Sequence, residues 1–443
     1  MHYTLMADVE GKLMPSYPTF DRNPLDLSDE AAAAGVAPAE HVVGELAAGR
    51  LRFACEDPDD PANFPRVLTQ WRANIIGSSM KGQEYFLRHM LGVPDAAVRN
   101  TETPPEDRPS EVVWRDEAPQ GKLDLFTTID FRMNGSCLYS DIVLPAATWY
   151  EKNDLSSTDL HPFVHTFGEA VPPPWEARTD FDAFRGIAER FSELAVTHLG
   201  VRRDLVAAPL LHDQPDELAQ PLGEVRDWKA GECDPIPGRT MPKLMVVERD
   251  YPAVAAKWAA LGPLVESAGI GVKGWSVKPT AAVAELAALN GTVRGGPGDG
   301  RPALERDVHW AEAIFALSGT TNGRLAVEGF RAMERRSGVP LADLVADRAD
   351  ERITFGEARI QPRKVITSPE WSGIESRDRR YNPFTINVER LVPWRTLTGR
   401  QQLYLDHAWM IDLGAAASRS PTSSRAAPTS ASPSARRVSS PAR

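Results

Sequence analysis

The sequence predicts an α/β protein built of mainly parallel, twisted sheets flanked by helices. An apolar, β-branched run at 123–129 ends in a polar loop, as a buried strand does. A second apolar run at 67–76 leads through a Gly/Ser turn into a helical segment at 83–91. Residues 181–199 repeat apolar side chains at helical spacing. Strands that alternate with amphipathic helices favour parallel pairing.

The remaining elements follow in chain order. Residues 1–60 are rich in loops, with a helical piece near 40–48. Beyond the helix at 181–199, apolar spacing predicts a strand at 243–247 and helices at 251–267, 281–289 and 311–317. A turn at 320–323 follows, and Gly323 begins a further helix.

We expect four parts along the chain, the last of which is set apart by its composition. These are a loop-rich segment (1–60), an α/β dinucleotide-binding region (61–200), a second α/β region with long connectors (201–413) and a tail (414–443). The tail has no acid and no aromatic residue, so we expect it to be disordered. Its arginines would suit an acidic partner, but out-of-frame translation of GC-rich DNA explains the composition more simply.

The overall composition excludes several classes of protein. The chain has 443 residues, 42% hydrophobic content and a net charge of −11, which argues against a nucleic-acid surface. No run of eighteen apolar residues exists, and no basic start precedes an apolar core, so we expect no direct membrane insertion. The three cysteines are isolated in sequence, which fits a reducing cytoplasm and no iron–sulfur ligand motif.

The turn after the first strand is a candidate phosphate cradle. Glycines let a backbone approach an anion, hydroxyls donate hydrogen bonds and a lysine supplies charge. The residues concerned are Gly77, Ser78, Ser79, Lys81 and Gly82. On spacing alone, an ordinary strand–helix turn with a solvated lysine is the more frequent structure.

The loop after the second strand holds further candidates. Asp130 can accept from ribose hydroxyls or guanine N–H groups, with Thr128, Arg132 and Ser136 beside it. The alternative is an Asx-turn or helix cap. Asp141 is expected first as a cap or strand-start hydrogen-bonder and second as a ligand contact.

Two pairs of charged or metal-binding residues have structural interpretations. Glu151 and Lys152 are expected to form an ion pair. His161 and His165 have the i, i+4 spacing of a metal site, but Pro162 argues against a continuous helix there, so a structural or cofactor-lining role is favoured.

The stretch 123–154 resembles the second prokaryotic signature of the molybdopterin oxidoreductases. The matching positions are Ser136, Cys137, Ser140–Pro145, Ala147, Thr148 and Glu151, whereas Asn134 departs from the usual small residue. Four segments, 71–92, 161–184, 368–382 and 391–410, are similar to the catalytic α subunit of respiratory nitrate reductases. The resemblance favours pterin-guanine-dinucleotide contact at the Gly/Ser turn, where Met80 departs from the family's small residue.

The resemblance implies a fold, a cofactor and partners. The fold would be that of the central domains of molybdopterin oxidoreductases. The reaction would be reduction of nitrate to nitrite at molybdenum held by molybdopterin guanine dinucleotide, with electrons from quinol through iron–sulfur clusters. The implied partners are an iron–sulfur β subunit, a cytochrome b γ subunit and a δ-type chaperone. The location would be cytoplasmic, at the inner face of the membrane through these partners.

Three features of that family are not visible in this sequence. They are the iron–sulfur segment, the molybdenum-ligating Asp and the C-terminal barrel. We therefore expect part of a cofactor cleft that is inactive alone. Two alternatives stay open: one chain of a split nitrate reductase, or a non-catalytic module that binds the cofactor or a chaperone.

Overall fold

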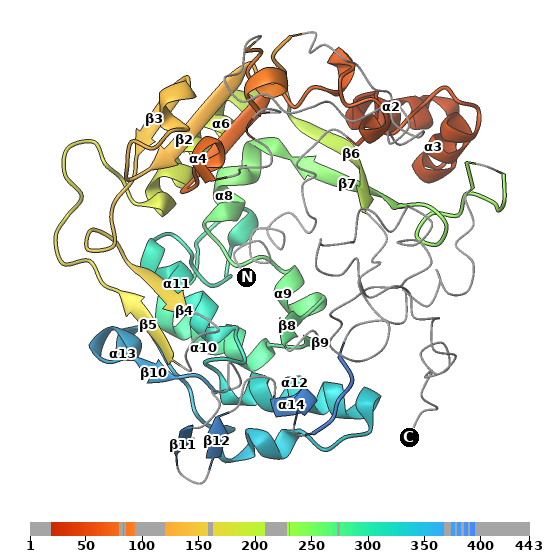
Figure 1. The fold of residues 1–443 in the computed structure, drawn as a ribbon. Helices are drawn as coiled ribbons and strands as arrows, with labels where there is room; N and C mark the ends of the chain where they lie inside the picture. Colours follow the sequence, from red (N-terminus) through yellow and green to blue (C-terminus); the bar gives the residue numbers. More distant parts are fainter. Residues whose placement is uncertain are drawn as a thin grey trace, which may run out of the picture.

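A computed structural model describes residues 19–78, 83, 86–93, 120–157, 163–208, 228–229, 231–272, 275–366, 374–376, 379–381, 385–388 and 390–394. In Figure 1 a small parallel sheet lies at one end of the molecule and a mainly helical part lies at the other. Within the described residues, no helix is both long enough and apolar enough to cross a bilayer.

The parallel sheet has three strands in the order β1-β2-β3. They span Val67–Trp71, Leu125–Asp130 and Ile142–Pro145. Both faces of β2 are covered: Phe126 packs with Phe86 on one face, and Ile129 packs with Ala183 of helix α6 on the other. This two-sided burial explains why the sequence of β2 is an unbroken apolar run, and it confirms the predicted strand.

One predicted boundary near this sheet was wrong. The strand expected at 67–76 ends at Trp71, because Arg72 adopts a left-handed backbone with φ of 50° and turns the chain. Short helix α4 (Ile75–Ser78) follows. The helix expected at 83–91 is present: Gln83 is helical, and Phe86–Met90 forms a π-helical turn whose Phe86 and Met90 are buried against the sheet. Residues 84–85 lie outside the described residues.

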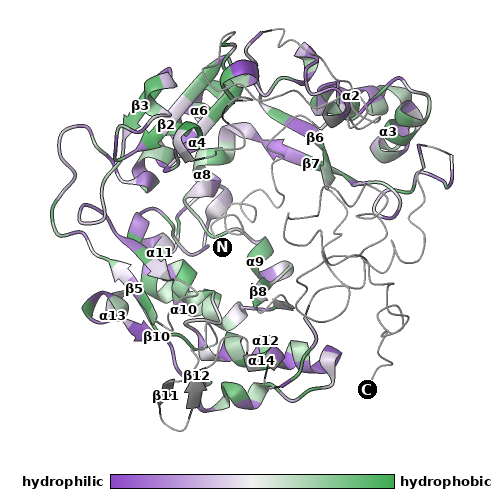
Figure 2. Cartoon of the chain, viewed as in Figure 1, coloured by the Kyte–Doolittle hydropathy of each residue, from purple (hydrophilic) through white to green (hydrophobic). Residues whose placement is uncertain are grey.

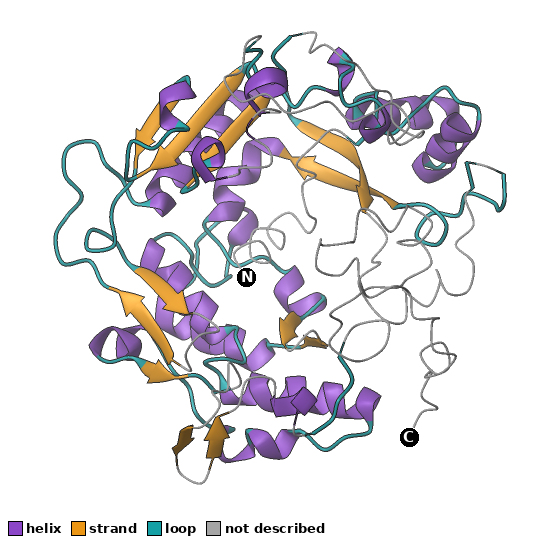
Figure 3. Cartoon of the chain, in the orientation of Figure 1, coloured by secondary structure: helices purple, strands orange, loops and turns teal. Residues whose placement is uncertain are grey.

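The other described sheets are antiparallel, so the parallel prediction holds only for β1-β2-β3. One is β10-β5-β4, formed by Arg363–Lys364, Phe163–Phe167 and Asp154–Ser157. Three are two-stranded: β6 (Val201–Ala208) with β7 (Lys243–Asp250), β8 (Ile270–Val272) with β9 (Trp275–Val277), and β11 (Ile374–Ser376) with β12 (Arg379–Tyr381). Figure 3 shows loops joining the parallel sheet to β4 and β5.

Most predicted helices are present with small shifts. They are α3 (Pro38–Ala47), α6 (Asp180–His198), α10 (Thr280–Asn290), α11 (Asp307–Ala316) and α12 (Gly323–Ser337). The structure adds α2 (Pro24–Ala34), α13 (Phe355–Ile360) and α14 (Thr385–Val388), which the sequence did not predict. In Figure 1, α2 and α3 lie beside the two-stranded β6–β7 sheet. Figure 2 shows hydrophilic and hydrophobic stretches alternating along α12, one face of which is buried.

The helix expected at 251–267 is broken into pieces. A 3-10 turn at Tyr251–Ala253 leads into α8 (Val254–Trp258), and α9 covers only Leu264–Ser267. Pro263 immediately precedes α9, where it cannot donate a helical hydrogen bond. Trp258, Leu261 and Val265 all point into the largest described core cluster, so the break serves packing.

Candidate functional site

The carboxyl ends of the three parallel strands meet at one edge. Trp71 pairs in register with Ile129, and Asp130 pairs with Pro145. Residues that directly follow these strands therefore come together, and ligands of open α/β sheets bind at such edges.

Asp130 organises the loop that follows β2. Its Oδ1 accepts from the Arg132 backbone N–H at 3.1 Å, and its Oδ2 accepts from the Asn134 side-chain amide at 2.8 Å. The same amide donates to the carbonyl of Ala73 at 3.2 Å, which ties this loop to the one after β1. The bond from the Arg132 N–H makes the Asx-turn that the sequence left open, and Asp130 is only 9% exposed.

Asn74 and Ser136 hold the start of α4. The Asn74 side-chain oxygen accepts from the Gly77 N–H at 2.9 Å and from the Ser136 hydroxyl at 3.1 Å. The Ser136 hydroxyl in turn accepts from the Ile76 N–H at 3.2 Å. A Cβ at Gly77 would overlap the Asn74 side-chain amide, so a larger residue would displace that amide from its hydrogen bonds to Gly77 and Ser136. The Gly77 N–H thus has a partner within the protein.

Thr128 and Asp141 make structural contacts. The Thr128 hydroxyl lies 2.6 Å from that of Ser140, and Asp141 accepts from the Phe126 N–H at 2.8 Å. The contact of Asp141 is the strand-start hydrogen bond that the sequence placed first. The Ser78 side chain, Ser79, Lys81 and Gly82 lie outside the described residues, so the cradle stays a prediction.

A cluster around Asp180 lies beside this edge and was not predicted. Asp180 is the first residue of α6, whose start Thr179 caps. Its carboxylate accepts from the Trp71 indole N–H at 2.8 Å, from Arg72 Nε at 3.0 Å and from Lys152 Nζ at 2.5 Å. Burial acts to raise the pKa of Asp180, but the hydrogen bonds from Lys152 and Trp71 and the two cations outweigh it and lower that pKa.

Lys152 corrects the predicted ion pair. It is 3% exposed and pairs with Asp154 and Asp180, each at 2.5 Å, instead of with Glu151. Glu151 turns back and accepts from the Thr148 N–H at 2.9 Å. Glu151 closes a turn that begins at Thr148 and its carboxylate folds back onto that turn, whereas Lys152 reaches Asp154 and Asp180, so adjacency in sequence did not become contact.

A pocket of about 130 Å³ opens beside this cluster. Its walls are aromatic rings and polar groups, namely Trp71, Lys152, Asn153, Asp154, Asp180, Phe181, Phe184, Trp258, Asp307 and Trp310, with Leu155, Thr179, Ala311 and Ile314. A cavity of about 150 Å³ accommodates benzene, so one flat ring fits this space.

Within the part of the chain that the structure describes, two polar atoms in the walls of this pocket have no hydrogen-bond partner. They are Asn153 Oδ1, an acceptor, and Trp258 Nε1, a donor, and both are buried. Buried polar groups are nearly always paired, so an unpaired acceptor and donor fit a small polar molecule between aromatic walls. The two atoms therefore suit the hydrogen-bonding edge of a planar base, of which about one ring fits the pocket.

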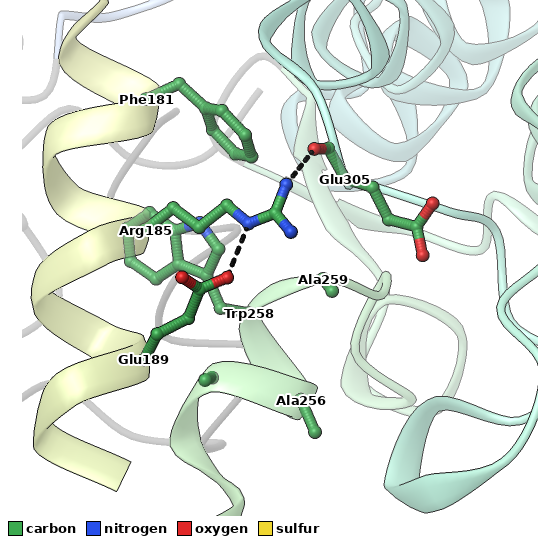
Figure 4. A pocket seen from close by; sticks show the side chains of 8 residues that line it. Phe181, Arg185, Glu189, Ala256, Trp258, Ala259 and Glu305 are labelled. Atoms are coloured by element: carbon green, nitrogen blue, oxygen red, sulfur yellow. Dashed lines mark hydrogen bonds and ion pairs between the residues drawn. The ribbon is translucent and has the colours of Figure 1, made fainter. Parts of the chain in front are cut away.

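A second pocket of about 240 Å³ shares Phe181 and Trp258 with the first. Figure 4 shows Arg185 across it, donating to Glu189 at 2.8 Å and to the backbone oxygen of Glu305 at 3.1 Å. The charged side chain of Arg185 that lines this pocket is already paired within the protein, so we assign no function to the pocket.

The described residues contain no group of three side chains suited to hold a metal ion. His165 lies on strand β5, which agrees with the objection that Pro162 raised against a helix, and His161 lies outside the described residues. Cys137 is buried at the sheet edge as a free thiol.

Comparisons with known proteins agree on one family. A family model described as molybdopterin oxidoreductase matches residues 27–190, and one described as nitrate reductase alpha chain, domain V, matches residues 268–389. The nitrate reductase alpha subunit of Mycobacterium tuberculosis H37Rv is 55% identical over 402 residues, which cover 90% of this chain and 32% of that protein. The chain belongs to the nitrate reductase alpha-chain family.

Further relatives of the same family are equally consistent. The respiratory nitrate reductase 2 alpha chain of Escherichia coli K12 is 47% identical, over 90% of this chain and 32% of that protein. The nitrate reductase alpha chain of Bacillus subtilis 168 is 48% identical, over 93% of this chain and 34% of that protein. This chain thus spans about a third of the length of the nitrate reductase alpha chains it matches.

Sequence reasoning about this nitrate reductase family member missed three residues of the site. Arg72 stood inside an expected strand, Lys152 was assigned to Glu151, and Asp180 was hidden at the start of a predicted helix. A signal existed for Asp180, because the Thr179-Asp180 pair has the composition of a helix N-terminus, where a carboxylate faces the preceding loops.

Proposed function

We propose that this chain forms the part of a nitrate reductase alpha subunit that binds a guanine dinucleotide arm of the molybdopterin cofactor. The observation that carries the proposal is the aromatic pocket at the carboxyl edge of β1-β2-β3, with Asn153 Oδ1 and Trp258 Nε1 unpaired in its walls. The family match supports the choice of cofactor.

In this proposal the pocket takes the base. Aromatic rings such as those of Trp71 and Phe184 give it flat apolar walls. Guanine carries neighbouring N–H donors on one edge, and Asn153 Oδ1 and the Asp180 carboxylate are acceptors on the wall. Lys152 holds the Asp180 carboxylate in place from within the protein.

The loops after the strands would take the remaining part of the dinucleotide. The residues predicted from sequence are retained here as proposed contacts: Gly77, Ser78, Ser79, Lys81, Gly82, Thr128, Asp130, Arg132, Ser136 and Asp141. Among those that are described, Arg132 is exposed at the edge, whereas Thr128, Asp130 and Ser136 are buried and act by shaping the loop. They would thus orient the ligand indirectly.

The bound cofactor supplies the two-electron chemistry of nitrate reduction, and this chain's residues bind and orient its dinucleotide. As part of the complete enzyme we propose the partners implied by the family resemblance: an iron–sulfur β subunit, a cytochrome b γ subunit and a δ-type chaperone. An alpha chain would then meet the membrane through these partners.

Nucleotide binding by the purified full chain tests the proposal. We expect calorimetric titration to show GDP binding at least about tenfold more tightly than ADP, because only guanine offers adjacent N–H donors to the two acceptors. Asn153→Leu removes the unpaired acceptor and should abolish the preference for GDP over ADP. Arg190→Gln on the exposed side of α6 is the matched control. Equal affinity for both nucleotides, or none for either, would refute the proposal.

A further inference from the structure

Arg72 has an unusual backbone at the sheet edge. It directly follows β1 and has φ of 50°, a left-handed conformation that a non-glycine residue adopts rarely and at a cost. Such residues concentrate at ligand sites, where the surrounding structure enforces them. The bend directs the Arg72 side chain along the carboxyl edge instead of along the sheet.

The Arg72 guanidinium reaches the ends of all three strands. It starts after β1, its Cζ lies 5.2 Å from the centroid of Phe131 after β2, and its Nη2 donates to the carbonyl of Ala147 after β3 at 3.1 Å. Nε donates to Asp180 at 3.0 Å. These contacts fix the plane of the guanidinium, and within the described part of the chain Nη1 keeps no hydrogen-bond partner. The side chain is 20% exposed.

A second guanidinium approaches the same ring. Arg132 Cζ lies 5.3 Å from the Phe131 centroid, and Arg132 is exposed. Two cations on one aromatic ring repel each other unless an anion lies near them. Asp180 and Asp154 balance the charges of Arg72 and Lys152, so among the described residues the exposed guanidinium of Arg132 is left without an ion-pair partner at this edge.

We propose that Arg72 and Arg132 form the anion subsite for the phosphate groups of the dinucleotide. This inference rests on the proposed function and adds the residues that would recognise the diphosphate. A guanidinium fixed on two sides with a third donor free suits a phosphate oxygen, because little rotational freedom is lost on binding. Arg72 would also link the phosphate to Asp180 in the wall of the base pocket.

The alternative is that Arg72 only positions Asp180. Comparison of GDP with guanosine separates the two roles, since both ligands carry the base and only GDP carries phosphates. Arg72→Gly is the informative variant, because glycine adopts the left-handed backbone freely and the turn survives. Arg72→Lys retains the charge without the fork of donors, and Arg190→Gln serves as the control arginine.

Titration calorimetry of the full chain with GDP and guanosine gives distinct outcomes. We expect Arg72→Gly to weaken GDP binding by about 10- to 100-fold and guanosine binding by less than about 3-fold, with Arg72→Lys between. The difference should shrink as salt is raised. Equal losses for both ligands would overturn the anion subsite and leave the base pocket standing. If the wild-type chain binds GDP and guanosine with the same affinity, the anion subsite is likewise overturned and the base pocket stands. If it binds neither ligand, both proposals are overturned.

Discussion

At the scale of single residues, Asp180 joins three segments through one carboxylate. The indole of Trp71, the guanidinium of Arg72 and the ammonium of Lys152 all donate to it, and it is 8% exposed. Removing one member of a buried charge cluster leaves the others uncompensated, which is more costly than the net gain from forming the cluster.

Asp180→Asn should therefore destabilise the protein by about 3–5 kcal/mol at pH 7. The pKa of Asp180 is lowered by folding, so its contribution is present above the ordinary pKa of Asp, about 3.9, and is lost as pH falls through the lower folded value. Urea denaturation at pH 7 and at acid pH measures this. A variant as stable as wild type at pH 7 would contradict it, and the difference should narrow in acid.

Asp59 offers a second acid-sensitive residue away from the site. His89 and Lys122 hold the pKa of Asp59 at about 2. Lys122 is 1% exposed and lies 2.6 Å from Asp59, so the pair links residues 58–59 to the start of β2.

We expect Asp59→Asn to remove about 2 kcal/mol of stability at pH 7, from a shift of roughly two pKa units. Because the folded pKa is depressed, this contribution is complete above about pH 4 and disappears between pH 4 and pH 2. Thermal melts across that range provide the measurement. The prediction fails if the variant and wild type differ equally at pH 7 and pH 2.

At the scale of elements, the first residue of α12 shows why one glycine cannot be replaced. Asn322 caps the helix by accepting from the Leu325 N–H, and Gly323 follows in a crowded position. A Cβ there would overlap the backbone carbonyls of Arg348 and Ala349. Backbone atoms cannot move aside as the end of a flexible side chain can. Gly44 in α3 has open space around the same position.

The two glycines give a matched pair of substitutions. Gly323→Ala should destabilise by about 2 kcal/mol or more, because the 346–349 turn must move. Gly44→Ala should stabilise by about 0.5–1 kcal/mol, since alanine lowers the entropy of the unfolded chain and favours the helix. Chemical denaturation measures the change in the free energy of unfolding for each variant. Changes of the same sign in the two variants would contradict the structural explanation.

At the scale of the whole molecule, the base pocket lies where several parts meet. Trp71 comes from the parallel sheet, Phe184 from α6, Trp258 from α8 and Trp310 from α11. The pocket walls pack against the largest described core, which contains Trp258 and Trp310. A ligand there would couple these parts.

GDP should consequently raise the melting temperature of the full chain. A ligand at 100 times its Kd adds about 2.7 kcal/mol, which corresponds to roughly 2–4 °C for a chain of this size. Scanning calorimetry with and without GDP measures the shift, with ADP at equal concentration as the control. An identical shift with ADP would point to non-specific anion binding.

Elements that depend on local sequence could be predicted, whereas features that depend on contacts between distant residues could not. The strand at 125–130 and the helix at 180–198 were predicted because apolar spacing is a local signal. The strand end at Trp71 was misplaced, because nothing in the local sequence reveals that Arg72 takes a positive φ. Helix α2 was missed, although Pro24 at its first position and the Asn23 cap were legible signals.

The sequence by itself determined the family and the local elements, since the signature at 136–151 and the apolar periods are read along the chain. Only the tertiary structure decided which charges meet. Trp71 and Asp180 are 109 residues apart yet share a hydrogen bond. Lys152 forms an ion pair with that same carboxylate and not with its neighbour Glu151. Parallel strands bring distant loops to one edge, so the composition of the site depends on sheet order and helix packing, which local spacing does not encode.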